Sequence, residues 1–209
     1  MARGASTIKS ISAITNHLPM QKLNIYAFGT GNDTKLGLGP EVNVKVVKRP
    51  RLNAHLLPDK VGIVAITIGG LHGLALLYEG KVYSWGANDH YALGRVITHT
   101  PLTRIVCSGD DGDSNGDDEV PLNPLESTPM LITVSPEVTV IPSIAASDSI
   151  LIAVTDTGRL YGWGTFRRTS VKEVPVLLPT PQSIIQVSIG TDHVLGLTKE
   201  GDMYAWGNG

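Results

Sequence analysis

The sequence predicts an all-β protein built from repeated units of the kind that assemble into a β-propeller. A four-residue turn, residues 69–72, is followed by Trp85 thirteen residues after its last member. Residues 147–150 precede Trp163, and residues 190–193 precede Trp206, at the same spacing. A glycine also lies five residues before each tryptophan. Three landmarks held in one register indicate a structural repeat.

Each copy of the repeat is typical of three short strands joined by two turns. In the first copy we expect strands at 63–68, 71–77 and 81–85, which are rich in β-branched or alternating apolar residues. The second turn of each copy ends in a glycine, which tolerates the positive φ of a tight hairpin. These glycines are Gly80, Gly158 and Gly201.

The chain carries too few copies to close a propeller ring. A fourth, partial copy is limited to the strand at residues 26–29, and the sequence ends directly after the Trp-Gly pair at 206–207. Propellers close with about four to eight blades, whereas about three are present here. We therefore expect a fragment with exposed sheet edges.

Composition divides the chain into a tail, a repeat region and an insertion. Six of the 19 acidic residues fall within residues 110–119, so the rest of the chain has a net charge of +4 against −2 overall. The surrounding segment is rich in Gly, Ser, Asn and Pro, which predicts a mobile surface insertion. The expected boundaries are a tail at 1–24, a partial propeller at 25–209 with repeats at about 25–86, 87–164 and 165–209, and the insertion at about 107–129.

Other features narrow the class of protein. No apolar run is long enough to span a bilayer, and the N-terminus lacks the apolar core of a secretory signal. Cys107 is the only cysteine and cannot form an internal disulfide, which favours an intracellular location.

Metal and enzyme motifs are weak or absent. Asp111, Asp113 and Asn115 fit the opening of a calcium loop, but its twelfth position is Leu122 instead of glutamate. The six histidines have no short zinc-binding spacing, and neither a phosphate loop nor a nucleophile elbow occurs. We predict no metal, no cofactor and no small-molecule substrate, and hence a protein that binds a macromolecule and is not an enzyme.

The repeats resemble the regulator of chromosome condensation family, and the similarity covers about residues 25 to 209. The resemblance is carried by residues 69–72 together with 82–95 (Val-Tyr-Ser-Trp-Gly-Ala-Asn-Asp through Ala-Leu-Gly-Arg). The segments 36–39, 47–53 and 125–129 are similar to fungal members in particular. The resemblance implies a seven-bladed propeller and a guanine-nucleotide exchange factor for the small GTPase Ran, located in the nucleus and attached to chromatin through histones or DNA.

The same resemblance implies which residues act. Asp148 matches the acidic residue on which exchange depends, while His72, Asp192 and His193 match face residues that meet Ran. Phe166 and Arg167 begin the segment from which the family projects a wedge toward the GTPase.

Each of these residues also has a purely structural interpretation. The histidines of the turns can be folding elements bonded to neighbouring backbone, and Asp148 can satisfy turn amides. The three tryptophans are expected to be blade-core residues that bind no ligand.

The chain departs from the family pattern at three places. Ser147 replaces a glycine and Ile150 a histidine, so this turn is expected to have a different shape. The interval from Trp163 to Trp206 is only 43 residues, which indicates a shortened wedge.

The third departure is the N-terminal tail, which offers few basic residues for chromatin attachment. Lys45, Lys48, Arg49 and Arg51 could instead form a nuclear signal or contact phosphates, or be solvated charges on an edge strand. The alternative function is a propeller scaffold that recruits proteins or chromatin without catalysing exchange.

Overall fold

The protein is almost entirely β-structure. The computed structural model describes residues 16–31, 34–40, 46–97, 122–138, 140–166, 170–180, 183–191 and 193–207. Within this part of the chain, no helix has the length and apolar character needed to cross a membrane. Because the described residues lie mainly in strands, the predicted all-β class is confirmed.

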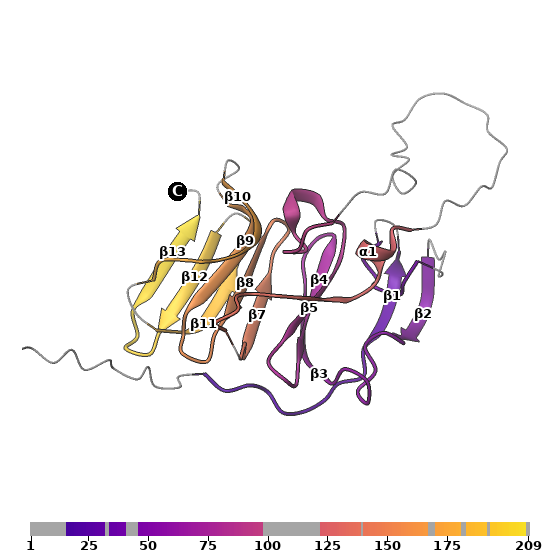
Figure 1. Cartoon of the computed structure of the whole chain (residues 1–209), viewed down its shortest axis with the longest axis horizontal. Helices are drawn as coiled ribbons and strands as arrows, with labels where there is room; N and C mark the ends of the chain where they lie inside the picture. Colours follow the sequence, from indigo (N-terminus) through magenta and orange to yellow (C-terminus); the bar gives the residue numbers. More distant parts are fainter. Residues whose placement is uncertain are drawn as a thin grey trace, which may run out of the picture.

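The described residues form thirteen strands in four antiparallel sheets, which stand side by side in chain order (Figure 1). The first sheet contains β1 (Tyr26–Thr30) and β2 (Val46–Leu52). The second contains β3 (Ile63–Ile68), β4 (His72–Leu77), β5 (Val82–Gly86) and β6 (Met130–Ile132). The third contains β7 (Ser143–Ala146), β8 (Ile150–Val154), β9 (Leu160–Phe166) and β10 (Ser170–Leu177). The fourth contains β11 (Ile184–Ile189), β12 (His193–Thr198) and β13 (Met203–Gly207). These sheets are complete or partial propeller blades.

The strand register reproduces the sequence repeat. The residue that opens the second strand of each unit pairs with the glycine that follows the tryptophan: His72 with Gly86, Ile150 with Gly164, and His193 with Gly207. At Gly86 a side chain would collide with the backbone carbonyl of Leu71. A side chain at Gly164 would likewise collide with the backbone carbonyl of Ser149, so in these two units the Trp-Gly landmark ends the hairpin where two backbones approach closely.

The hydrophobic core lies between neighbouring sheets. Strands β4 and β8 are buried along their whole length, since each has another sheet on both sides. One cluster joins the second and third sheets through Leu74, Leu151 and their neighbours. Separate clusters join the third sheet to the fourth, and the first to the second. Each sheet is thus stabilised by the next, as expected of a repeat architecture.

Two tryptophans are locked in place by the loop of the preceding sheet. The indole N–H of Trp85 donates to Lys35 O at 3.0 Å, and that of Trp163 donates to Ala92 O at 3.0 Å. Gly37 and Gly94 lie on the two indole rings, where a Cβ would be within 2.6 and 2.7 Å of ring atoms. Both glycines also have positive φ. The prediction of blade-core tryptophans is confirmed for these two.

The third tryptophan is covered less completely. Trp206 is only partly buried, although it packs against the core cluster of the last two sheets and stacks on Tyr204. The covering loop should come after β9, but β10 begins at Ser170 and the intervening residues contain no Leu-Gly pair. The sequence at this place thus offers no counterpart of Gly37 and Gly94.

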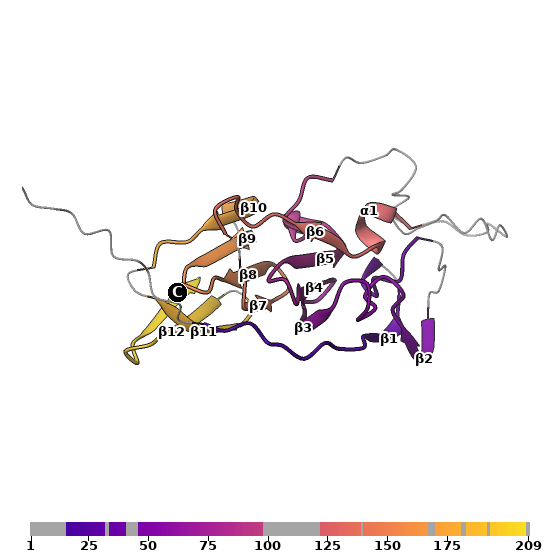
Figure 2. The same cartoon turned by 60° about the horizontal axis from the view of Figure 1, so that its bottom comes forward.

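Residues 16–25, which precede β1, run across the ends of all four sheets (Figure 2). The side-chain amide of Asn16 donates to Thr155 O at 3.1 Å and to Ile184 O at 2.9 Å, in the third and fourth sheets. Leu23 N donates to Ile63 O at 2.7 Å in the second sheet, and Ile25 O accepts from Asn53 N beside the first. We call residues 16–25 the strap.

The described end of the expected insertion is folded. Residues 107–121 lie outside the described residues, but 122–129 contain helix α1 (Pro124–Ser127). The side chain of Asn123 accepts from Leu125 N at 3.0 Å, and Ser127 Oγ donates to Asn123 O at 2.8 Å. Proline at the first helical turn and an Asn cap favour this short helix, so the insertion does not extend as a loose loop to residue 129.

Candidate protein-binding face

Three strand-connecting turns from successive sheets meet at the end of the molecule opposite the strap. They join β3 to β4, β7 to β8, and β11 to β12. Between them lies an open depression of about 390 Å³. Its lining includes Ile68, Gly70, Ala146, Asp148 and Thr191. A wide, shallow surface of this kind suits contact with another protein better than enclosure of a small ligand.

Asp148 presents the carboxylate of this face. Its side chain is exposed, and no salt bridge to it occurs among the described residues. An atom at the Cβ position of Gly70 would be 2.6 Å from Oδ1 of Asp148, so the carboxylate lies directly over the turn of the neighbouring sheet. The structure therefore places an accessible negative charge at the junction between two blades.

Ser147 fixes the turn that carries Asp148. Its hydroxyl oxygen accepts from Ile150 N at 3.0 Å and from Ser149 N at 3.3 Å, and lies 3.2 Å from Ile150 O. These bonds close the turn locally, in the manner of a Ser turn motif. The departure from glycine at this position thus supplies a hydroxyl that holds the turn.

His72 is buried beneath this junction. Its side chain is 2% exposed, and Nε2 has no hydrogen-bond partner among the described residues. Burial lowers the pKa of His72 below its usual value, while the Asp148 carboxylate and the Ser147 backbone oppose that shift. The imidazole is therefore held neutral at neutral pH, out of reach of a large partner.

The other predicted site residues are placed as follows. His193 is exposed and lies over Gly190 of its own turn. Phe166 is partly buried at the end of β9, with its ring over Gly162. Asp192 and Arg167 lie outside the described residues. Of the set, Asp148 and His193 are both exposed on adjacent turns of the face.

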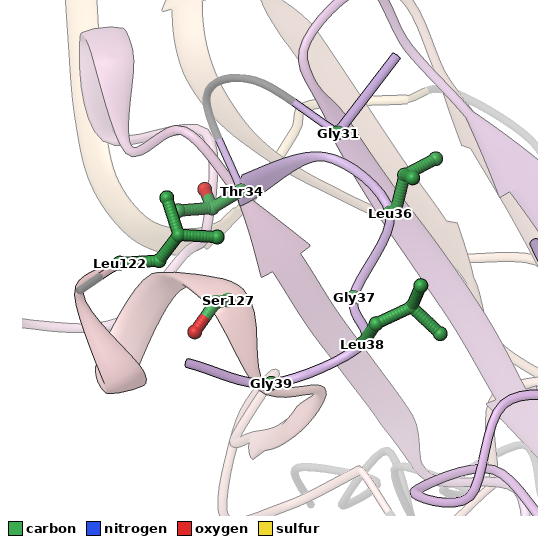
Figure 3. A pocket seen from close by; sticks show the side chains of 8 residues that line it. All are labelled: Gly31, Thr34, Leu36, Gly37, Leu38, Gly39, Leu122 and Ser127. Carbon is green, nitrogen blue, oxygen red and sulfur yellow. The ribbon is translucent and has the colours of Figure 1, made fainter. Parts of the chain in front are cut away.

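One further cavity among the described residues is far smaller than this depression. A second cavity lies between the loop after β1 and helix α1, with Thr34, Gly37 and Ser127 on its walls (Figure 3). Its volume is about 10 Å³, close to the least space that holds one water molecule. In the described part of the chain, no three His, Cys, Asp or Glu side chains gather as metal ligands.

Sequence reasoning did not identify Gly70 as part of the site. Its position beside the Asp148 carboxylate depends on how two sheets pack. The Gly-Gly pair at 69–70 is unusual within the repeat, since the other copies have Ser-Asp or Gly-Thr at these places. That doubling is the signal that could have found it.

Comparison with known proteins identifies repeats of one family along the chain. Profiles of the regulator of chromosome condensation (RCC1) repeat match residues 63–92 and 184–209, and residues 79–154. Protein pim1 of Schizosaccharomyces pombe is 41% identical over 202 residues, covering 92% of this chain and 35% of that protein. Guanine nucleotide exchange factor SRM1 of Saccharomyces cerevisiae is 39% identical over 211 residues, covering 92% of this chain and 43% of that protein.

A solved structure agrees with the fold. The crystal structure of Prp20p from Saccharomyces cerevisiae, described with its binding properties to Gsp1p and histones, matches with a TM-score of 0.74 at 37% identity. The match covers 93% of this chain and 43% of that one. The chain thus spans less than half the length of each of these three proteins.

Proposed function

The chain belongs to the regulator of chromosome condensation (RCC1) family, and on that premise we propose that it serves guanine-nucleotide exchange on the small GTPase Ran. Two observations support the proposal together. A relative that is 39% identical is named a guanine nucleotide exchange factor. The face described above presents an exposed carboxylate beside a wide depression formed by three successive turns.

Exchange of this kind requires binding alone. The exchange protein binds the nucleotide-free GTPase more tightly than the GDP-loaded form. By thermodynamic linkage, it weakens the binding of the nucleotide by the ratio of these two affinities. GDP then leaves and GTP takes its place. No covalent bond is made or broken, so the protein needs no catalytic constellation.

Asp148 is the residue of this chain best placed to contribute. Its carboxylate can compete for the lysine and the magnesium ion that hold the nucleotide phosphates in Ran. Its exposure leaves it free to reach a partner, while the turn held by Ser147 limits its motion. His193 on the adjacent turn, with Asp192 and Arg167, completes the proposed contact set.

The direct test compares the affinity of the 209-residue chain for nucleotide-free Ran with its affinity for GDP-loaded Ran. We expect tighter binding to the empty form, and we expect Asp148→Ala to remove most of that preference. The carboxylate is exposed and has no salt bridge in the described structure. The variant should therefore lose no more than about 0.5 kcal/mol of unfolding free energy, the usual range for surface substitutions. Equal binding to both forms would reject exchange.

A scaffold without exchange activity is the second candidate. It is favoured by the shortened hairpin at the end of β9, where β10 begins at Ser170, four residues after Phe166. A family member that lacks the projecting wedge could bind Ran, or chromatin proteins, without displacing the nucleotide. Equal affinity for the two forms of Ran, with binding retained, would identify this case.

A nuclear, chromatin-associated location follows from the same proposal. Prp20p, the relative of known structure, is described with binding to histones. In this chain Lys48, Arg49 and Arg51 are exposed on β2, at the edge of the first sheet. These cations can contact acidic partners or phosphates, and they also discourage unwanted pairing of the sheet edge.

A further inference from the structure

The turn between β3 and β4 packs directly against the turn that carries Asp148. A Cβ at Gly69 would collide with the backbone carbonyl of Ser147. A Cβ at Gly70 would lie 2.6 Å from Oδ1 and 3.1 Å from Cγ of Asp148. Real Cβ atoms do not approach other atoms so closely, so a side chain at either position would force the neighbouring atoms to move.

Space, and not backbone conformation, requires these two glycines. Gly70 and Gly69 are absent from the glycines with positive φ, whereas Gly80, in the hairpin of the same sheet, has φ of 75°. An alanine at position 70 would therefore fit the backbone. Its methyl group would meet only the end of the Asp148 side chain, which must then move.

His72 lies beneath the same contact. A Cβ at Gly69 would be 2.7 Å from Nε2 of His72, which places the imidazole against the turn. Asp148 is the charged group that acts on the imidazole, and its charge raises the pKa that burial lowers. The pKa of His72 therefore depends on the distance between its imidazole and the Asp148 carboxylate.

This arrangement is not repeated at the other described junction. The turn between β7 and β8 has Ile150 in place of the histidine and Ser147 in place of the first glycine. In the last unit His193 folds over its own Gly190 and is exposed. A bare Gly-Gly surface under a neighbour's carboxylate is thus specific to the junction of the second and third sheets.

We propose that Gly70 is a positioning residue for Asp148: its missing side chain seats the carboxylate against the β3–β4 turn in the orientation that exchange uses. This inference rests on the exchange function proposed above. Gly70 contributes no chemical group of its own and acts only through the place it gives to Asp148.

The first test does not depend on Ran. The titration of His72 is followed by NMR in the wild type, in Asp148→Asn and in Gly70→Ala. Removal of the negative charge in Asp148→Asn should lower the pKa of His72, because that charge favours the imidazolium form. Gly70→Ala should change the same pKa without changing any charge, since it moves the carboxylate. A His72 titration in Gly70→Ala that matches the wild type would overturn the proposal.

The second test is a double-mutant cycle on GDP release from Ran. Gly70→Ala should slow release by about tenfold or more, as displacement of a reacting group by about 1 Å commonly does. In the Asp148→Ala background, Gly70→Ala should cause no further loss, because the two residues act as one unit. Additive losses would show that Gly70 acts independently and would reject the inference.

Gly69→Ala separates positioning from folding. Its methyl group would meet the Ser147 backbone, which cannot turn aside, so this variant should lower the thermal midpoint. Gly70→Ala meets a side chain and should leave the midpoint close to that of the wild type. If the wild type does not accelerate GDP release at all, the proposed function fails, and the His72 titration still decides the positioning of Asp148.

Discussion

The side chain of Asn16 is expected to hold the third and fourth sheets together. Its amide makes two hydrogen bonds, at 3.1 Å to Thr155 O and at 2.9 Å to Ile184 O. A hydrogen bond of this kind contributes about 1 kcal/mol net, so Asn16→Ala should cost about 2 kcal/mol of unfolding free energy. Thr155 and Ile184 are 3% and 0% exposed. Where no water replaces the amide, their carbonyl groups lose a partner and the cost rises to about 3 kcal/mol.

Urea denaturation, followed by circular dichroism, measures this loss as a lower midpoint at unchanged slope. Asn16→Asp has the same size but cannot donate and puts a negative charge beside two carbonyl oxygens, so it should destabilise more than alanine. His17→Ala is the matched control, since His17 is an exposed neighbour in the strap. A loss below about 0.5 kcal/mol for Asn16→Ala, the range of ordinary surface changes, would refute the role of the strap.

Two further predictions concern the core and the pH dependence of stability. Gly94→Ala should lower the free energy of unfolding by about 3 kcal/mol or more, because Gly94 has φ of 62° and a Cβ there would be 2.7 Å from Nε1 of Trp163. A red shift of tryptophan fluorescence should accompany this loss of stability. An unchanged fluorescence spectrum together with an unchanged thermal midpoint would contradict the prediction. The pKa of His72 in the folded protein lies below its usual value of 6.5, so the unfolded chain binds the proton more readily. Protonation of His72 therefore favours unfolding. The stability of the folded protein is greatest above pH 6.5 and decreases as the pH falls below that value. The thermal midpoint of the wild type should therefore fall when the pH is lowered below about 6.5. It should fall less in the His72→Gln variant, and an equal fall in both proteins would show that His72 is not responsible.

The sequence predicts the strands and their turns well because both depend on local chemistry. The strand expected at residues 63–68 is β3 without change, and those expected at 71–77 and 81–85 differ from β4 and β5 by one residue at their ends. Gly80, Gly158 and Gly201 all have positive φ, as a tight hairpin requires. Alternation of side chains and turn glycines are properties of neighbouring residues, so they can be read without tertiary structure.

Features that arise between sheets could not be predicted in this way. The hydrogen bonds of Asn16 join residues more than 130 positions apart, and the strap has no regular pattern. Burial of His72 results from the neighbouring turn at Ser147, whereas His193 at the matching place in the last unit is exposed. The repeat locates both histidines on the same end of their strands, but packing decides which of them a partner can touch.

The candidate site shows the same division. The turn at Asp148 was predicted from the repeat register, and the resemblance to the family supplied its expected role. The doubled glycine at 69–70 marks an unusual turn, but its contact with the Asp148 carboxylate required the structure, because that contact depends on how two sheets pack.

The rate of release of fluorescent GDP from Ran tests the central claim most directly. We predict that the 209-residue chain accelerates release and that Asp148→Ala removes most of the acceleration while the protein remains folded. A folded wild-type chain that leaves the release rate unchanged, or an Asp148→Ala variant as active as the wild type, would contradict the exchange function based on Asp148.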